Sequence, residues 1–229
     1  MTSNLKIIKE KLRIAALLAI NAGFIDAYTF FHYDARFAGA QTGNLVQAGI
    51  AIAQGKWGLL GDFLLPIFFF MLGIIFRTVV SYFRIKHGRR ATTYLLWVQM
   101  IFILIFVTLY IFFFDFKPTV AISALSFIMA IQMNNFSVTR GLSYGSIFST
   151  ANMRSFAQNI AQFFLTKDKE KLKNSSVYLI LVVSFFVGST VSTLSQRFIG
   201  EWTLYGSAIL LSLVLVIFHF ELENLKSEL

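Results

Sequence analysis

The sequence contains no cysteine and few charged residues, and each shortage excludes classes of protein. Without thiols, the chain has no disulfide framework and no thiolate metal ligand or nucleophile. Only 14% of its 229 residues are charged, whereas an average soluble domain carries roughly a quarter. The three histidines are scattered, and neither a phosphate-binding Gly-Lys loop nor a Gly-x-Ser-x-Gly motif is present. These absences argue against an enzyme and predict that the protein uses no cofactor and no metal.

The sequence is rich in long apolar runs. Hydrophobic residues make up 57% of the chain, and its 27 phenylalanines fall mostly in long apolar runs. A hydrocarbon core about 30 Å thick needs about 20 apolar residues per helix, and lipid offers the backbone no hydrogen-bond partner. Six runs meet this requirement and are predicted to be transmembrane helices. They cover approximately residues 13–33, 59–83, 92–114, 119–139, 175–196 and 203–220.

The net charge of +9 is concentrated in alternate connections between these runs. Basic residues gather in the N-terminal segment and in the connections after the second and fourth runs, whereas the remaining connections are neutral. This alternation follows the positive-inside rule for a multi-pass protein with both termini in the cytoplasm. The alternative is that the basic clusters are merely solvated loops. The distribution predicts the lipid bilayer, and no nucleic acid, as a partner.

A polar-striped segment between the first two runs, residues 37–55, is apolar enough to enter a bilayer but too short to cross it. Thr42, Gly43 and Asn44 are typical of a helix start. Asn44 and Gln47 then share one face of the implied helix. Because this polar face suggests a cavity lining, we predict a short re-entrant helix. The alternative is an interfacial helix that lies flat on the membrane.

The second half of the chain repeats this arrangement. Shifting the sequence by 108 positions lays residues 20–44 over residues 128–152. The matched positions include Thr42 with Thr150, Asn44 with Asn152 and Asp26 with Asn134. Each half contains three runs, and because three is odd, the second half enters the membrane the opposite way up. Such inverted repeats with short helices are characteristic of secondary transporters, whose sites lie near the membrane midplane.

The predicted fold is therefore an all-α integral membrane protein. Six transmembrane helices form two inverted three-span repeats, each with a short re-entrant half-helix. Residues 1–229 form a single membrane domain, in which 1–116 are the first repeat, 117–220 the second repeat and 221–229 a cytoplasmic tail. The N-termini of the two half-helices are expected to approach each other near the centre. Free N–H groups at helix N-termini favour an anionic or polar acceptor.

Polar side chains around the two half-helices are predicted to bind the solute. They are Thr42, Asn44, Gln47, Gln132, Asn135, Thr150, Asn152 and Gln158. Intramembrane amides can equally hold helices together. A buried carboxylate such as Asp26 is costly unless it is paired or neutral, so Asp26 is a functional candidate with Arg77 as its partner. Arg77 can instead snorkel to the interface, and Asp26 can have a purely structural role. Gln99 suggests a homo-oligomer contact.

A family resemblance rests on several of these residues. They are Gly23 and Asp26 in the first run, Phe37, Thr42-Gly43-Asn44, Gln132 with Asn135, and Thr150-Ala151-Asn152. With them the chain resembles the YoaK family of small bacterial membrane proteins of unknown function over nearly its whole length. The resemblance implies a six-span protein of the bacterial inner membrane and supplies no substrate. Ala151 stands where a glycine is expected, which implies a less tightly turned second repeat.

These features together predict a secondary transporter of a small polar or anionic solute, in which Asp26 is a proton-linked or structural acid. One alternative is a channel, which would show flux without saturation or coupling. Another is a non-transporting scaffold or assembly factor, which would bind a stable protein partner and no metabolite.

Overall fold

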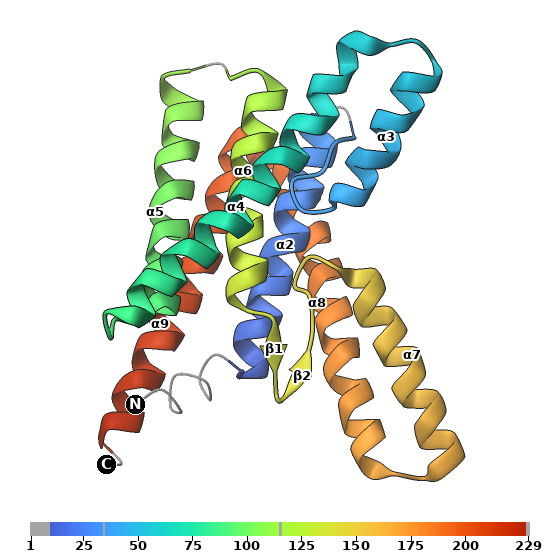
Figure 1. Cartoon of the computed structure of the whole chain (residues 1–229), viewed down its shortest axis with the longest axis vertical. Coiled ribbons are helices and arrows are strands. Elements are labelled where there is room, and N and C mark those ends of the chain that lie inside the picture. The colour runs from blue at the N-terminus through green and yellow to red at the C-terminus, as the bar shows by residue number, and fades with distance from the viewer. Residues whose placement is uncertain (1–9, 34, 115, 228–229) are drawn as a thin grey trace.

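The computed structural model describes residues 10–33, 35–114 and 116–227, and nearly all of them are helical (Figure 1). The α-helices are α2 (Leu12–His32), α3 (Gln41–Ala53), α4 (Leu60–Lys86), α5 (Ala91–Phe112), α6 (Pro118–Asn135), α7 (Ser149–Thr166), α8 (Lys169–Ile199) and α9 (Tyr205–Ser227). Two 3-10 turns, η1 (Trp57–Leu59) and η2 (Gly200–Leu204), precede α4 and α9. Strands β1 (Val138–Thr139) and β2 (Leu142–Ser143) form a hairpin. The predicted all-α class is confirmed.

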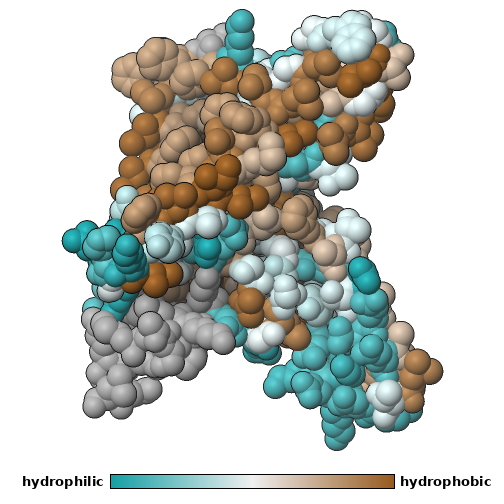
Figure 2. Space-filling model, viewed as in Figure 1, coloured by the Kyte–Doolittle hydropathy of each residue, from teal (hydrophilic) through white to brown (hydrophobic). Residues whose placement is uncertain are grey.

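Four segments of the described chain are long and apolar enough to cross a bilayer. They are Leu12–His32, Trp57–Lys86, Ala91–Phe112 and Lys169–Glu221, of which the last is 53 residues long and contains α8 and most of α9. Helix α6 is not among them, because Gln132, Asn134 and Asn135 make its last turn polar. Exposed phenylalanine, isoleucine and leucine side chains cover α4 and α5, where Figure 2 shows a largely hydrophobic surface. These are features of a helical membrane protein.

In the core, helices from one half of the chain pack against helices from the other half. The most extensive contacts join α2 to α8 and α6 to α4, so the first long helix of each half packs against the second long helix of the other. Glycines allow these close approaches. A Cβ on Gly188 would lie 2.0 Å from the Ile20 carbonyl oxygen, and a Cβ on Gly73 would lie 2.4 Å from the Phe127 carbonyl oxygen. Small residues at such crossings let helix backbones pack closely.

Helix α6 ends at Asn135, four residues before the predicted end of its run, because the chain enters the β1–β2 hairpin. Arg140 and Gly141 both have positive φ, 49° and 77°, as a two-residue turn between strands requires. Glu10 anchors this turn: its carbonyl oxygen accepts the Arg140 N–H (2.9 Å), and its carboxylate accepts the Gly141 N–H (3.0 Å). The predicted span therefore stops where these contacts begin.

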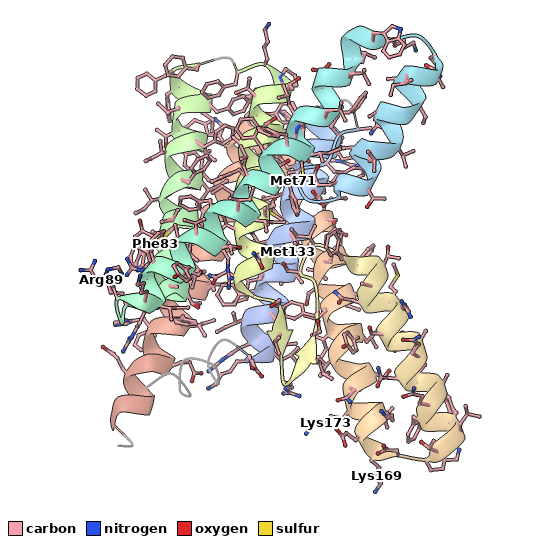
Figure 3. The ribbon with its side chains drawn as sticks, viewed as in Figure 1. Met71, Phe83, Arg89, Met133, Lys169 and Lys173 are labelled. Carbon is pink, nitrogen blue, oxygen red and sulfur yellow. The ribbon has the colours of Figure 1, made fainter. Side chains whose placement is uncertain are left out.

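Two segments outside the predicted spans are largely helical. Of the charged residues 167–173, only Lys167 and Asp168 lie outside helices, because Lys167 takes a left-handed conformation (φ 58°) and the Asp168 side chain caps α8 by accepting the Glu170 N–H at 2.8 Å. The predicted tail, 221–229, continues α9 as far as Ser227. Arg89, in the connection after α4, and Lys169 and Lys173, at the start of α8, lie in the lower half of the view (Figure 3).

Candidate functional site

Each of the helices α3 and α7 follows a loop that one asparagine holds closed. Asn44 Nδ2 donates to the Phe37 carbonyl oxygen (2.7 Å), and the Phe37 N–H donates to Asn44 Oδ1 (3.1 Å). Asn152 makes the same pair with Gly145, at 2.9 Å and 3.5 Å. An amide side chain provides the donor and the acceptor that this arrangement needs. We call these two sets of contacts the asparagine clamps.

The clamped loops touch each other in the interior of the molecule. A Cβ on Gly39 would lie only 2.6 Å from Ile147 Cγ2, so the two residues are in direct contact. Gly39 and Ile147 are also related by the shift of 108 positions that relates Asn44 to Asn152. From this contact α3 and α7 run toward opposite ends of the molecule (Figure 1). Helix α7 has 18 residues against 13 in α3, so it is longer than a predicted half-helix.

Asp26 lies beside the same contact. Its side chain is buried, with 2% exposure, and its Oδ1 accepts the Gly39 N–H at 2.6 Å. Its Oδ2 has no hydrogen-bond partner among the described residues. The predicted ion pair with Arg77 is not formed, because Asp26 points at the loop before α3, whereas Arg77 lies on α4 one turn beyond the glycine that packs against α6. Arg77 is half-buried, and its Nε lacks a partner in the part of the chain described.

Asp26 lines a cavity of about 360 Å³ between α2, the loop before α3 and α8. The other lining residues are Ala27, Phe30, Phe31, Phe37, Phe185, Ser189 and Thr193. A second cavity, of about 460 Å³, lies against the second clamp and includes Asn134, Gly145 and Asn152 in its lining. Asn134 and Gly145 are the counterparts of Asp26 and Phe37 at the shift of 108 positions. The two cavities thus occupy related places, and only the first has a carboxylate at the shared position.

Gln132 connects α6 to α2 and to the second loop. It accepts a hydrogen bond from Asn21 Nδ2 (2.7 Å), and it donates to the Leu18 carbonyl oxygen (3.0 Å) and to Ser146 Oγ (3.4 Å). Asn135 donates to the Thr92 carbonyl oxygen (3.3 Å), which ties α6 to α5. These amides, predicted as solute ligands, hold helices together in this structure, which is the alternative that the sequence left open.

The remaining predicted site residues either form hydrogen bonds with other residues or lie at the surface. Gln47 donates to the Ala35 carbonyl oxygen at 2.7 Å and so fixes the loop before α3. Thr42, Thr150 and Gln158 are exposed. Gln99, predicted as an oligomer contact, is fully buried inside the chain, so it cannot meet a second copy.

Sequence reasoning missed the residues that complete the Asp26 cavity. Gly39 was not singled out, although a glycine thirteen residues after a buried carboxylate is free to bring its N–H close to it. Ser189 and Thr193 lie among the small hydroxyl residues of the fifth run, a pattern that indicates helix packing. Ser189 Oγ does donate to the Gly23 carbonyl oxygen (3.1 Å) across the α2–α8 contact.

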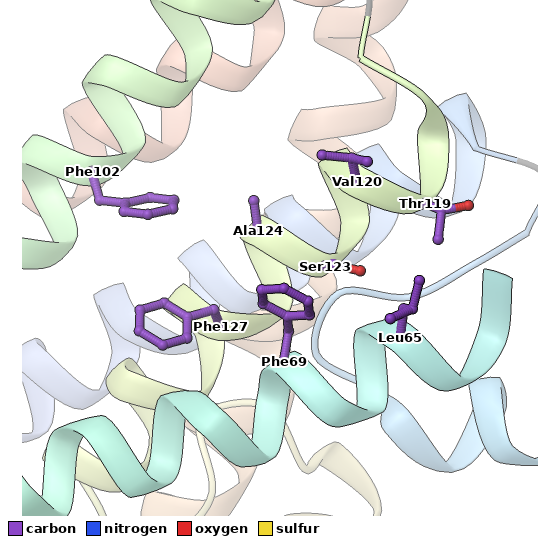
Figure 4. A pocket seen from close by; sticks show the side chains of 8 residues that line it. All are labelled: Leu65, Phe69, Phe102, Thr119, Val120, Ser123, Ala124 and Phe127. Carbon is purple, nitrogen blue, oxygen red and sulfur yellow. The ribbon is translucent and has the colours of Figure 1, made fainter. Parts of the chain in front are cut away.

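A further cavity, of about 340 Å³, lies between α4, α5 and α6 (Figure 4). Phe69, Phe102 and Phe127 supply its aromatic walls, and Ser123 and Thr119 are its polar residues. No charged side chain lines it. This cavity therefore offers shape but little chemistry for recognition, in contrast to the cavity beside Asp26.

Comparison with known proteins gives one result. A family model described as a protein of unknown function (DUF1275) matches residues 14–217. Neither the curated proteins nor the solved structures contain a match to the chain.

Proposed function

Since the chain belongs to DUF1275, a family of unknown function, we propose an activity from its geometry: it is a secondary transporter of a small polar solute in the bacterial inner membrane. In this proposal α2, α4, α5, α6, α8 and α9 are the six spans, arranged as two inverted three-span repeats. Helices α3 and α7 are the re-entrant helices. We further propose that the chain groups with the YoaK proteins, and the residues that it shares with them support this proposal.

The contact between Gly39 and Ile147 is the observation that carries this proposal. Two loops with the same asparagine clamp meet at equivalent positions, and the helices that follow them diverge to opposite ends (Figure 1). Inverted-repeat transporters bind their solutes where two such interrupted segments meet near the midplane. Asp26 and its cavity lie at this meeting point.

The packing of helices from one half against helices from the other gives independent support to the two-fold relation between the halves. The α2–α8 contact has the α6–α4 contact as its counterpart, as a two-fold relation between the halves requires. Contacts of α9 with α2 and of α5 with α6 form a second such pair. Alternating access by rocking one repeat against the other would act at these glycine-rich crossings.

The charge distribution supports an orientation with both termini in the cytoplasm. Arg89, Lys169 and Lys173 lie toward the end of the molecule at which α2 begins and α9 finishes (Figure 3). Positive residues are retained on the cytoplasmic side of membrane proteins. The polar surface of the α7–α8 hairpin in Figure 2 then faces the cytoplasm rather than lipid.

The structure argues against the anionic solute that the helix N-termini predict. The Gly39 N–H at the loop tip already binds a carboxylate of the protein itself, Asp26. An anion placed here would meet a like charge, and like charges at short range in an apolar site are strongly unfavourable. We therefore propose a solute without net negative charge, with Asp26 as the group that couples its movement to a proton.

Transport is tested in proteoliposomes with an imposed pH gradient. Radiolabelled choline, alanine and glucose serve as cationic, zwitterionic and neutral probes. The proposal expects saturable, gradient-driven uptake of at least one probe, which Asp26→Asn abolishes and the surface variant Glu170→Gln retains. Non-saturable flux would identify a channel instead. Absence of flux for every probe, together with a protein partner that copurifies, would identify a scaffold.

A further inference from the structure

The cavity beside Asp26 combines one carboxylate with aromatic walls. Four phenylalanines, Phe30, Phe31, Phe37 and Phe185, make up half of its eight lining residues, and Ser189 and Thr193 supply two hydroxyl groups. No lysine, arginine or histidine lines it. Its volume of about 360 Å³ falls at the small end of the range for small-molecule sites, which is about 300–1,000 Å³.

No ion pair is formed by the Asp26 carboxylate within the part of the chain that the structure describes. It is 2% exposed, Gly39 donates to Oδ1, and Oδ2 is buried without a hydrogen-bond partner among the described residues. Of the described arginines, Arg36 pairs with Asp62 (3.6 Å), and Arg77 lies on α4. A carboxylate buried at membrane depth needs a cation or a proton to be stable there.

The aromatic walls suit the remainder of an organic cation. Phe30 and Phe37 lie together with ring centroids 5.0 Å apart and planes tilted by 35°, and both line the cavity. The faces of aromatic rings attract cations, most strongly where water is excluded, and quaternary ammonium groups are bound in this way. A hydrated metal ion would instead need several oxygen ligands, whereas this lining offers one carboxylate and two hydroxyls that bond their own helix or its neighbour.

The corresponding cavity in the second half supplies an internal comparison. Asn134 replaces Asp26 at the equivalent position, and its amide lies 3.4 Å from Thr78 Oγ1. Glycine at 145 replaces Phe37, so that cavity has lost both the charge and this aromatic ring. The second cavity keeps aromatic residues in its lining, Tyr144, Phe148 and Tyr178, but it has no carboxylate, so the charge expected of a cation site is found only in the first of these two cavities.

We propose that the Asp26 cavity binds a small organic ammonium cation. The charged nitrogen lies against the Asp26 carboxylate, and the carbon groups lie against the phenylalanine rings. This inference names the solute class of the transporter proposed above and rests on that proposal only for the claim that the cation is transported. Binding itself follows from the cavity.

Binding is measured by titration calorimetry and thermal unfolding of the purified full chain. Choline and its uncharged carbon isostere, 3,3-dimethylbutan-1-ol, are the probes, because they share shape and differ in charge. Choline is expected to bind and raise the unfolding temperature, whereas the isostere binds at least about 30-fold more weakly. Phe30→Leu should weaken choline binding roughly 2- to 30-fold through the lost ring face.

Variants of charge provide the decisive comparison. Asp26→Asn should lower choline affinity at least about 30-fold, and Glu170→Gln, which removes one exposed carboxylate from the start of α8, should leave it unchanged. If Asp26→Asn does not fold, Thr193→Lys places a cation at the cavity wall and should abolish binding. Equal binding of choline and its isostere, or unchanged binding in these variants, would overturn the inference. Choline binding without flux would overturn transport alone, and flux of a neutral probe without choline binding would overturn the cation site alone.

Discussion

Asn44 and Asn152 hold two loops in the same way, each by a pair of hydrogen bonds to the residue seven positions earlier. Both side chains are almost fully buried, at 0% and 2% exposure. Their amide groups are therefore occupied by Phe37 and Gly145. The clamps fix the positions of the two loops. The first loop in turn brings the Gly39 N–H to Asp26.

Removing the first clamp should destabilise the protein. Asn44→Ala removes the partners of the part-buried N–H and carbonyl oxygen of Phe37, at a total cost of about 1–3 kcal/mol. Thermal unfolding in detergent measures the loss. Asn159→Ala on α7 is the matched control, because Asn159 bonds only its own helix, at the Ser155 carbonyl oxygen. Equal losses in the two variants would show that the clamp adds nothing to stability.

The contact between the two loops predicts a coupled pair of substitutions. Gly39→Ala adds a methyl group 2.6 Å from Ile147 Cγ2 and about 3 Å from both Asp26 oxygens, so it should destabilise the loop contact by about 1–3 kcal/mol. Ile147→Ala removes the first clash, and the double variant should recover part of that loss. Gly49→Ala on α3 has nothing within 4 Å and should be neutral or stabilising. Additive losses in the double variant would exclude a direct contact.

Apolar length and the internal repeat made the helices predictable. Each predicted run lies mainly within one helix, because lipid leaves the backbone no alternative to helical hydrogen bonds. The hairpin around Arg140 and Gly141 was not predicted. Its residues continue the apolar run of α6, and its anchor, Glu10, is more than 100 residues away in the sequence. Only the Arg-Gly pair hints at a two-residue turn.

The candidate site was predictable in position and not in detail. The sequence predicts that the helix starts at Asn44 and Asn152 approach each other, and in the structure the loops before these helices are in contact beside Asp26. The sequence does not show which buried polar side chains form hydrogen bonds with backbone groups. Charge complementarity predicted Arg77 as the partner of Asp26, whereas the observed hydrogen-bond partner is the Gly39 N–H. Every residue except proline has a backbone N–H, so side-chain types do not reveal which N–H will bind a buried carboxylate.

The α2–α8 crossing should tolerate no side chain at Gly188. A Cβ there would lie 2.0 Å from the Ile20 carbonyl oxygen, and the backbone of a packed helix cannot retreat. Gly206→Ala meets only the ring of Phe24, at 2.5 Å, and a ring can turn aside. Gly188→Ala should therefore lose most monodisperse protein in size-exclusion chromatography, and Gly206→Ala should lose less. The reverse order would contradict the packing.

The proposed inverted arrangement predicts opposite accessibility for the connections that follow α3 and α7. Because the chain contains no cysteine, single cysteines can be labelled without background. Lys56→Cys lies in the connection after α3, and Lys169→Cys at the start of α8. A membrane-impermeant maleimide added to intact bacterial cells should label the first and spare the second, which should react only after lysis. Labelling of both from one side would show that the halves are not inverted.

The tips of the same helices should be less reactive than these connections. Thr42→Cys and Thr150→Cys lie in the first turns of α3 and α7, at the ends nearest the Gly39–Ile147 contact, and both native side chains are exposed. If these ends lie near the midplane, bulky maleimides should label them at least about tenfold more slowly than the surface cysteines, because lipid and protein limit access and the thiol ionises poorly there. Small cationic thiol reagents should reach Thr42→Cys, beside the loop that carries Asp26, faster than Thr150→Cys. Rates equal to those at positions 56 and 169 would place both tips at the membrane surfaces and remove the central site.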